Sequence, residues 1–333
     1  MSKVKSWMRL LKIDPIPLIM DRAPVYIKYR TALEFFSEDS ALIEELSEKL
    51  ENDKARRKIL ESQTDNGTWK LKENYSLEEQ QRAMQFLLQL KMLAQLYDLG
   101  CNKEMAPVQK AIIALLKMQK PDGKFPLHYH HHGLALLLLV KYGLGGNPFV
   151  DKGFRWIAKR QRVDGGWLSP ATMKSGKSFK SSRSDIWASI VILQAFSSHS
   201  RLKRSETAMR AAEFILDSYL QKNETNLFPE AEAWNYLYTD YTDTGLFRGG
   251  TLRFIEALAP LYDFHEHPKF KKAVNWMLDQ QMKDGLFPAV AGLSTKGDFN
   301  VTLRFLICLK EMDSAEKRTN VETGEEKNER EER

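Results

Sequence analysis

One short phrase recurs along the chain: Gln, two residues, Asp or Asn, Gly, one residue and then an aromatic residue. Complete copies begin at Gln63, Gln119, Gln161 and Gln281, and a degenerate copy that has lost its Asp-Gly lies at 221–228. The copies lie roughly 40–60 residues apart, a spacing typical of repeat architectures. Each copy follows one helical pattern and precedes another, so the phrase predicts a helix end followed by a tight turn.

The segments between the copies are of two kinds. The first kind is apolar over most of its surface, and a helix of that pattern must be surrounded by protein. These segments are 26–36, 84–99, 134–142, 186–196, 252–261 and 301–309. The second kind is amphipathic with a charged stripe: 42–60, 108–118, 150–159, 206–220 and 270–278. Their alternation predicts an all-α fold with concentric layers of inner and outer helices.

The repeated phrase resembles the QW repeat of squalene-hopene cyclases, oxidosqualene cyclases and protein prenyltransferase β subunits. The resemblance covers residues 24–312, and the segments 134–143 and 154–157 also look like uncharacterised single-domain proteins of this superfamily. It implies an α/α toroid of the α6/α6 type with a central cavity. The repeat is specific for this fold and not for one chemistry, because cyclases, transferases and non-catalytic binding proteins share it.

The catalytic motifs of these enzymes are missing from the chain. The cyclases protonate an alkene with an Asp-x-Asp-Asp motif, and Asp240 and Asp243 have the wrong register for it. Those cyclases also need two helical domains, and this chain has the length for one. The prenyltransferases bind zinc through an Asp two residues before a Cys, which neither Cys101 nor Cys308 has. The resemblance therefore carries over the fold and the turn residues, and no catalytic residue.

Composition and the two ends of the chain limit the remaining classes of function. The net charge of +6 is scattered along the chain, without the concentrated basic face of a nucleic-acid binder. Two distant cysteines favour a reducing cytoplasm. We expect an N-terminal extension (1–23), a toroid domain (24–312) and a charged, disordered tail (313–333). The basic and apolar residues of the extension fit either a membrane-surface helix or a first helix packed on the outside of the fold.

We expect the site where the inner helices begin, because their N-terminal ends and the preceding loops line the mouth of such a ring. Helix N-termini also favour anionic ligands. The candidate ligand-binding residues are charged, polar or aromatic side chains at these ends: Arg82, His130, His132, Arg183, Trp187, Trp234, Tyr241, Arg248, Asn300 and Arg304.

Three aspartates at the same ends are the candidate catalytic residues. Asp185 fits the N-cap of an inner helix and equally an acid or base beside the aromatic wall. Asp240 and Asp243 fit an ordinary Asx-turn loop or a carboxylate pair at the cavity mouth. The histidines at 128 and 130–132 could bind a metal or simply cap the following helix. We assign no metal ligand from the sequence and identify no cofactor.

Three functions remain compatible with these features. The first is binding or conversion of an isoprenoid or other hydrophobic small molecule, which the resemblance implies. The second is a carbohydrate-active hydrolase or lyase, in which Asp185 pairs with Asp240 or Asp243 beside stacking aromatics. The third is a scaffold without activity, which predicts a cavity plugged by its own side chains. An open polar groove would favour the second function and a dry apolar hole the first.

Overall fold

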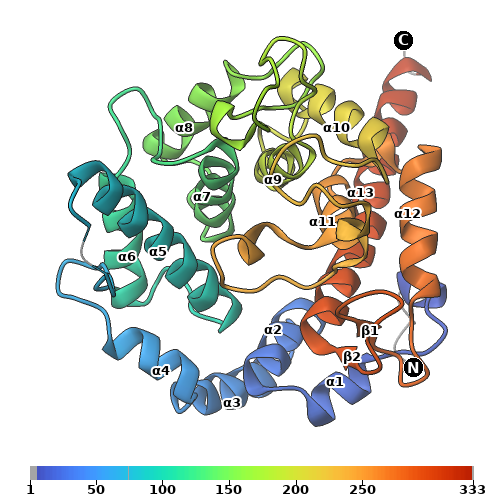
Figure 1. The fold of residues 1–333 in the computed structure, drawn as a ribbon. Helices are drawn as coiled ribbons and strands as arrows, with labels where there is room; N and C mark the ends of the chain where they lie inside the picture. Colours follow the sequence, from blue (N-terminus) through green and yellow to red (C-terminus); the bar gives the residue numbers. More distant parts are fainter. Residues whose placement is uncertain (1–5, 74, 332–333) are drawn as a thin grey trace.

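The computed structural model describes residues 6–73 and 75–331, with side chains as far as Ala315. Within this part of the chain the helices form two concentric layers around a centre, as Figure 1 shows. The inner layer consists of α2 (Val25–Phe35), α5 (Glu78–Asp98), α7 (Tyr129–Lys141), α9 (Ile186–Ser197), α11 (Gly250–Leu258) and α13 (Phe299–Glu331). The outer layer consists of α1 (Ile16–Arg22), α3 (Ser40–Glu51), α4 (Lys54–Glu61), α6 (Ala106–Lys117), α8 (Pro148–Ala158), α10 (Glu206–Ser218) and α12 (Pro268–Asp279). The predicted all-α toroid is confirmed.

Burial explains the two layers. Every side chain of α9 is buried, which agrees with its mainly apolar sequence, whereas α6 and α8 each keep an exposed stripe. One expected outer helix was wrong in extent: 42–60 is two helices, α3 and α4, separated by Asn52 and Asp53. The Asp53 side chain accepts a hydrogen bond from the backbone amide of Arg56. This N-cap starts a new helix where the hydrophobic pattern alone suggested continuity.

The repeated Gln side chains join each repeat to the next. Each Gln Nε2 donates to the carbonyl of the Gly in its own phrase, at 2.8–3.3 Å. The same nitrogen donates to a carbonyl at the start of the next outer element, at 2.7–3.0 Å. The acceptors are Pro107, Phe149, Thr207 and Ile13. The phrase is therefore both a turn and a clamp between neighbouring repeats.

The Gly of the phrase is required for close approach. Gly165 has a φ of +88°, and a Cβ there would collide with the carbonyl oxygen of Arg210 on α10. Gly67 and Gly123 meet carbonyls of α6 and α8 in the same way. A residue with a side chain would be strained by the backbone conformation and would also push the next outer helix away.

The degenerate copy at 221–228 makes no such clamp. Gln221 Nε2 donates to the carbonyl of Asp217 near the end of α10 (Glu206–Ser218), and its oxygen accepts from Arg183. After this copy the chain forms η3 (Ala231–Asn235) and then crosses the centre of the ring through η4 (Gly245–Phe247) before α11 begins. Figure 1 shows this crossing segment in front of the ring's centre. We call residues 236–249 the strap.

The first and last parts of the chain close the ring. Gln281 Oε1 accepts from the backbone amide of Lys12, and its Nε2 donates to the carbonyl of Ile13. The 3₁₀ helix η1 (Ser6–Leu10) buries Trp7 against Phe35, with ring centroids 5.4 Å apart. Residues 1–5 of the expected extension lie outside the described part, and the rest packs on the ring.

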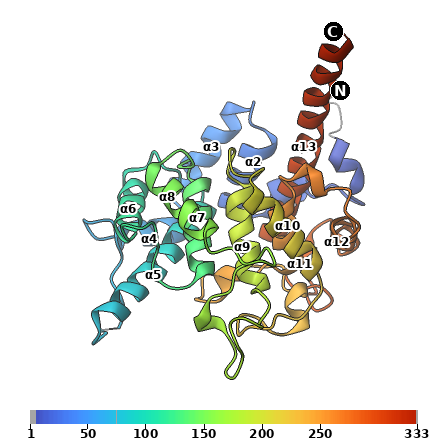
Figure 2. The same ribbon diagram turned by 90° about the horizontal axis from the view of Figure 1, so that it is seen from above.

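The remaining elements are a short hairpin and the long last helix. Strands β1 (Phe287–Pro288) and β2 (Gly297–Asp298) pair antiparallel just before α13. Helix α13 projects beyond the ring in Figure 2 and continues to Glu331, through the segment expected as a disordered tail. Its Glu, Lys and Arg residues are good helix formers, which permits helical backbone without an apolar face.

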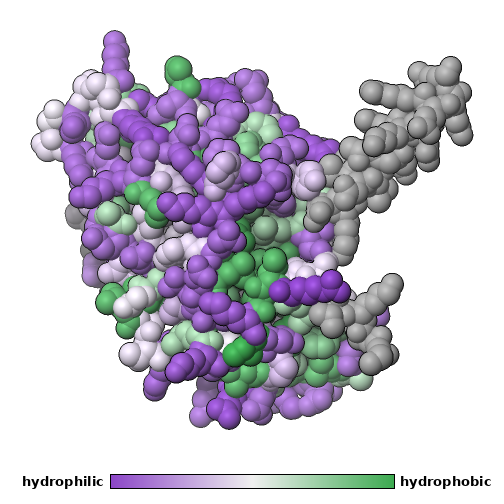
Figure 3. Space-filling model, turned by 90° about the vertical axis from the view of Figure 1, so that its right-hand side faces the viewer, coloured by the Kyte–Doolittle hydropathy of each residue, from purple (hydrophilic) through white to green (hydrophobic). Residues whose placement is uncertain are grey.

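The outside of the ring is mainly hydrophilic. The side shown in Figure 3, which carries α12 and the N-terminal segment, has apolar residues gathered in its lower half. Within the N-terminal segment, Leu10 and Ile13 are exposed. Among the described residues, helices of sufficient length and apolarity to cross a bilayer are absent.

Candidate functional site

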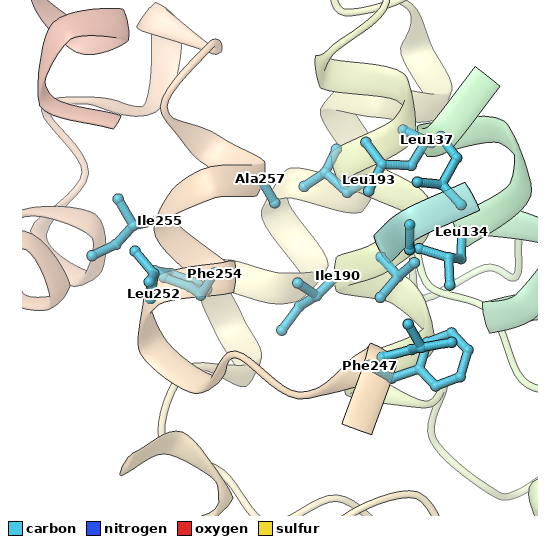
Figure 4. Packing of buried hydrophobic residues seen from close by; sticks show 14 of the residues in the cluster. Leu134, Leu137, Ile190, Leu193, Phe247, Leu252, Phe254, Ile255 and Ala257 are labelled. Carbon is cyan, nitrogen blue, oxygen red and sulfur yellow. The ribbon is translucent and has the colours of Figure 1, made fainter. Parts of the chain in front are cut away.

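The end of the ring where the inner helices begin, the N-terminal mouth, is filled by protein side chains. Phe247 on the strap is 1% exposed and places its ring 4.5 Å from that of His130 and 4.9 Å from that of His131. Figure 4 shows Phe247 close to Leu134 at the edge of the apolar core. The strap thus seals the mouth at which the sequence placed the site.

The histidines of this mouth are part of its packing. His132 Nδ1 accepts from the backbone amide of Phe125, the aromatic residue of its repeat. The hydroxyls of Ser189 and Thr302 accept the corresponding amides in two other repeats, so His132 occupies a structural position of the repeat. Burial lowers the pKa of His132 to about 4, and that of His131 to about 3. In the described part of the chain, groups of three His, Cys, Asp or Glu residues placed to hold a metal ion are absent.

Asp185 is buried at the N-cap of α9. Its side chain accepts hydrogen bonds from the backbone amide of Ala188 at 3.0 Å, from Thr225 Oγ1 at 2.6 Å and from Asn223 Nδ2 at 3.3 Å. Burial raises its pKa, and these three hydrogen bonds act against that rise. The structure surrounds Asp185 with donors from its own chain, an arrangement that suits a cap holding the degenerate repeat against α9.

Asp240 and Asp243 point to different partners. Asp240 accepts from the amide and hydroxyl of Thr242 in a turn of the strap. Asp243 pairs with Lys91 on α5 at 2.7 Å. Between them, Tyr241 donates to Asp98 at 2.8 Å. The contacts of Tyr241 and Asp243 anchor the strap to α5, and neither Asp240 nor Asp243 has a hydrogen bond or ion pair with Asp185 among the described contacts.

The other predicted residues are spread over the same mouth. Trp187 donates to the carbonyl of Phe228 and packs against Trp234, with centroids 4.8 Å apart. Arg248 lies over the rings of three aromatic residues, at 5.0–5.8 Å. Arg183 bonds Ser218, Arg82 is exposed, and Asn300 Oδ1 is buried without a partner. The cavity beside Trp187 measures only about 10 Å³, so these side chains fill one another's space.

The opposite end, the C-terminal mouth, contains a large cavity. This outer compartment measures about 760 Å³ and lies where the inner helices end. Its wall combines aromatic side chains with charged and polar ones. They include Tyr29, Arg30, Glu34, Tyr97, Lys141, Tyr142, Gln194, Glu256, Arg304, Cys308 and Glu311. Of the residues predicted from the sequence, only Arg304 lines it.

An inner compartment of about 70 Å³ lies between this cavity and the strap. It shares Arg30, Tyr97, Lys141, Gln194, Glu256 and Arg304 with the outer compartment. Its other walls include Arg253 on α11, and Asp240 and Tyr241 on the strap. Two of the residues predicted from the sequence, Asp240 and Tyr241, therefore do line a central space, although this space adjoins the C-terminal mouth and not the N-terminal one.

An ion pair spans the junction of the two compartments. Arg304 on α13 donates to both carboxylate oxygens of Glu256 on α11, at 2.7 and 2.8 Å. Burial opposes ionisation of Glu256, but Arg304 more than offsets it and lowers the pKa of Glu256 to about 2. Glu256 is therefore an anion at physiological pH and cannot act as a general acid there. Bidentate geometry makes this a strong, directional pair.

The charged and amide residues of this cavity wall could have been found from the sequence. Arg253 and Glu256 interrupt the apolar segment 252–261, and Gln194 and Arg304 interrupt 186–196 and 301–309. A lone charged or amide group on a helix that must be buried needs an internal partner or a polar cavity. Reading these interruptions together would have pointed to the C-terminal half of the ring.

No family model matches this chain, and no curated protein matches it. Solved structures are similar to this chain at low identity. A glycosyl hydrolase of family 88 from Bacteroides vulgatus is 14% identical, with a TM-score of 0.48, over 87% of this chain and 90% of its own. A polysaccharide lyase is 14% identical, with a TM-score of 0.46, over 95% and 98%. The type II terpene cyclase MstE from Scytonema is 14% identical, with a TM-score of 0.30, over 81% and 98%. These likenesses concern the fold alone.

Proposed function

We propose that this protein binds a polar, polyhydroxylated small molecule of the sugar type in the outer compartment at the C-terminal mouth. The observation that carries the proposal is the composition of the wall. Arg30, Lys141 and the Glu256–Arg304 pair alternate there with tyrosine rings. Polar ligands are held by hydrogen bonds from such groups while their apolar faces stack on aromatic rings.

The same wall argues against an isoprenoid as the ligand. Covering ionised groups with hydrocarbon removes their hydration and supplies no replacement partner, which costs several kcal/mol for each ion. The aromatic residues that suggested an isoprenoid, such as Trp187 and Trp234, fill the N-terminal mouth instead. The proposed ligand enters from the other end of the ring.

The ionised carboxylates of this wall suit binding of the ligand. Hydrolysis of a glycosidic bond needs a protonated acid near neutral pH, and Glu256 is kept ionised by Arg304. Glu34 at the rim is paired with Lys310 on α13, at 3.1 Å. We therefore expect Glu256 and Glu34 to serve as hydrogen-bond acceptors for ligand hydroxyls.

Thermal-shift and calorimetric titration with two panels tests this function. One panel contains mono- and disaccharides and their acids, and the other contains geraniol, farnesol and geranylgeraniol in matched solvent. We expect saturable binding in the first panel alone, weakened at least about tenfold by Tyr97→Ala because a stacking surface is lost. Tyr75→Ala, which lies before α5 at the other mouth, is the control. Binding of only the isoprenols, or unchanged binding by Tyr97→Ala, contradicts the proposal.

A further inference from the structure

Arg253 is a buried cation whose donors are incompletely used. It is 6% exposed on α11, and its Nε and Nη1 atoms have no hydrogen-bond partner among the described atoms. A guanidinium carries five N–H donors, and leaving them unpaired in the interior is costly. A neighbouring carboxylate would remove the cost of these unpaired donors, and so would an apolar residue in place of Arg253. Arg253 lies instead beside a cavity, and a ligand there could supply the missing acceptors.

The charges around the inner compartment do not balance. Its four cations are Arg30, Lys141, Arg253 and Arg304, and its three anions are Asp98, Asp240 and Glu256. Two pairs account for four of them: Arg30 with Asp98 at 3.1 Å, and Arg304 with Glu256 at 2.7 Å.

The three remaining groups leave a positive surplus. Asp240 uses its Oδ1 for the turn with Thr242. Lys141 places its ammonium over the ring of Tyr97, at 5.3 Å, and its charge also acts on Glu256, which Arg304 already pairs. Lys141 and Arg253 therefore face the compartment with one carboxylate between them, and that carboxylate is directed partly into its own loop.

A neutral group completes the site. Gln194 Nε2 donates to Glu256 at 3.1 Å, while its Oε1 is buried without a partner. Gln194 lines both compartments. An unpaired carbonyl oxygen requires a donor, and a ligand hydroxyl next to an anionic group would supply one.

We propose that the inner compartment is a subsite for one anionic group, a carboxylate or a phosphate, on a polyhydroxylated ligand whose body lies in the outer compartment. Arg253 and Lys141 hold the anion, and Gln194 Oε1 accepts from a neighbouring hydroxyl. The subsite rests on the proposed function and adds to it the charge of the ligand. Its volume of about 70 Å³ suits a single small group and excludes a second sugar ring.

The positive charge of Arg304 also acts on Arg253, and this repulsion supports an anion site at Arg253. Burial and the positive charge of Arg304 lower the pKa of Arg253 to about 10. Arg253 and Arg304 therefore repel each other, while the carboxylates that act on both, Glu256 and Asp98, are already paired with Arg304 and Arg30. An anion bound at Arg253 removes this repulsion, so ligand binding and relief of the unfavourable charge are the same event.

The test uses inorganic phosphate and matched sugar pairs on the full-length protein. At constant ionic strength held with chloride, we expect phosphate to raise the Tm of the wild type in a saturable way, by a few degrees at about 100 times its Kd. Glucose 6-phosphate and glucuronate should bind at least about tenfold more tightly than glucose. Arg253→Met should abolish the phosphate shift and the tenfold preference.

Arg253→Met makes a second, opposite prediction without ligand. Because it removes an unpaired buried charge, we expect its Tm to equal or exceed that of the wild type. Lys141→Met, at the partly open end of α7, should weaken phosphate binding as well and keeps the inference testable if Arg253→Met does not fold. Lys117→Met, the last residue of outer helix α6, is the matched control and should change neither measurement.

The outcomes separate this subsite from the general function. If glucose and its anionic relatives bind equally and phosphate has no effect, the subsite is wrong and the binding function stands. If none of these compounds binds, both are wrong. A lower Tm of Arg253→Met with unchanged phosphate binding also overturns the subsite, because Arg253 would then serve the fold alone.

Discussion

The same six inner helices build two very different mouths. Where they begin, the strap brings Phe247 between the ends of α7 and α9, and the largest space left beside Trp187 is about 10 Å³. Where they end, charged and tyrosine side chains surround about 760 Å³. The ring of helices alone therefore does not determine which mouth stays open to a ligand. The segment that follows the degenerate repeat determines it, because this segment leaves the outer layer, crosses the centre and closes one mouth.

The charges of the two mouths follow the same division. Asp185 at the closed mouth is held by neutral donors, and burial raises its pKa. Glu256 at the open mouth is held by Arg304, which lowers its pKa to about 2. Asp185 thus caps a helix, and burial disfavours its ionised form. Glu256 is a permanent anion in a charged network beside the cavity.

The largest expected effect comes from removing the plug of the closed mouth. Phe247→Ala leaves a cavity next to His130 and His131, and we expect it to lower the free energy of unfolding by about 3–5 kcal/mol. Chemical denaturation measures this change. Phe149→Ala, whose side chain is 54% exposed on α8, is the control and should cost less than about 0.5 kcal/mol. A small effect of Phe247→Ala would mean that the strap rests on the ring without sealing it.

The pH dependence of stability distinguishes the mouths next. The folded pKa of Glu256, about 2, lies below its unfolded value of 4.5, so its ionised form stabilises the fold. This contribution, about 3 kcal/mol, is complete above pH 4.5 and is lost as the pH falls toward 2. We expect Glu256→Gln to be less stable than the wild type at pH 7 and nearly equal to it near pH 2.

Denaturation at a series of pH values measures this difference. Glu45→Gln is the control, because Glu45 forms only an exposed pair with Lys49 on α3 and should give a difference that hardly changes with pH. A constant difference between the wild type and Glu256→Gln from pH 7 to pH 2 would show that Glu256 stabilises the fold through packing and not through its charge.

Asp185 should show the opposite sign. Its folded pKa is above the ordinary 3.8, so the ionised form opposes folding once the pH rises through the folded pKa. Asp185→Ala removes the cap and leaves Asn223 and Thr225 without their shared acceptor, which should cost about 2 kcal/mol at pH 7.

The conservative variant separates the cap from a catalytic group. Asp185→Asn keeps an acceptor for the amide of Ala188 and should cost less than about 1 kcal/mol. A catalytic acid or base would lose its activity in both variants while stability changed in only one. If an activity is found, comparing its loss with the loss of stability in these two variants decides between the roles.

The sequence predicted the helices of the ring because each repeat is a local unit. Spacing of apolar residues located the inner segments, and Gln-x-x-Asp-Gly located their turns. It could not predict the path of 236–249, since the contacts of Tyr241 with Asp98 and of Asp243 with Lys91 join residues far apart in the chain. Knowing that the strap closes one mouth would have moved the expected site to the other.

Removing single contacts of the strap should have smaller effects than Phe247→Ala, Glu256→Gln or Asp185→Ala, and it tests directly how the closed mouth is held. Tyr241→Phe removes a hydrogen bond to the carboxylate of Asp98, which also pairs with Arg30 at the cavity wall. We expect a loss of about 1.5 kcal/mol, because the acceptor is charged and the pair is only partly exposed. Lys91→Met removes an ion pair whose Asp243 side chain is 56% exposed and should cost at most about 0.5 kcal/mol.

Hydrogen exchange of the strap amides shows whether this difference is local. If Tyr241 is the main anchor, Tyr241→Phe should speed exchange in 236–249 while leaving α7 and α9 protected, because the opening involves the strap alone. Arg30 would keep Asp98 as its partner, so ligand binding at the C-terminal mouth should change little. Should Tyr241→Phe instead weaken binding there as much as Tyr97→Ala, the strap and the cavity wall form one unit, and the closed mouth helps to shape the open one.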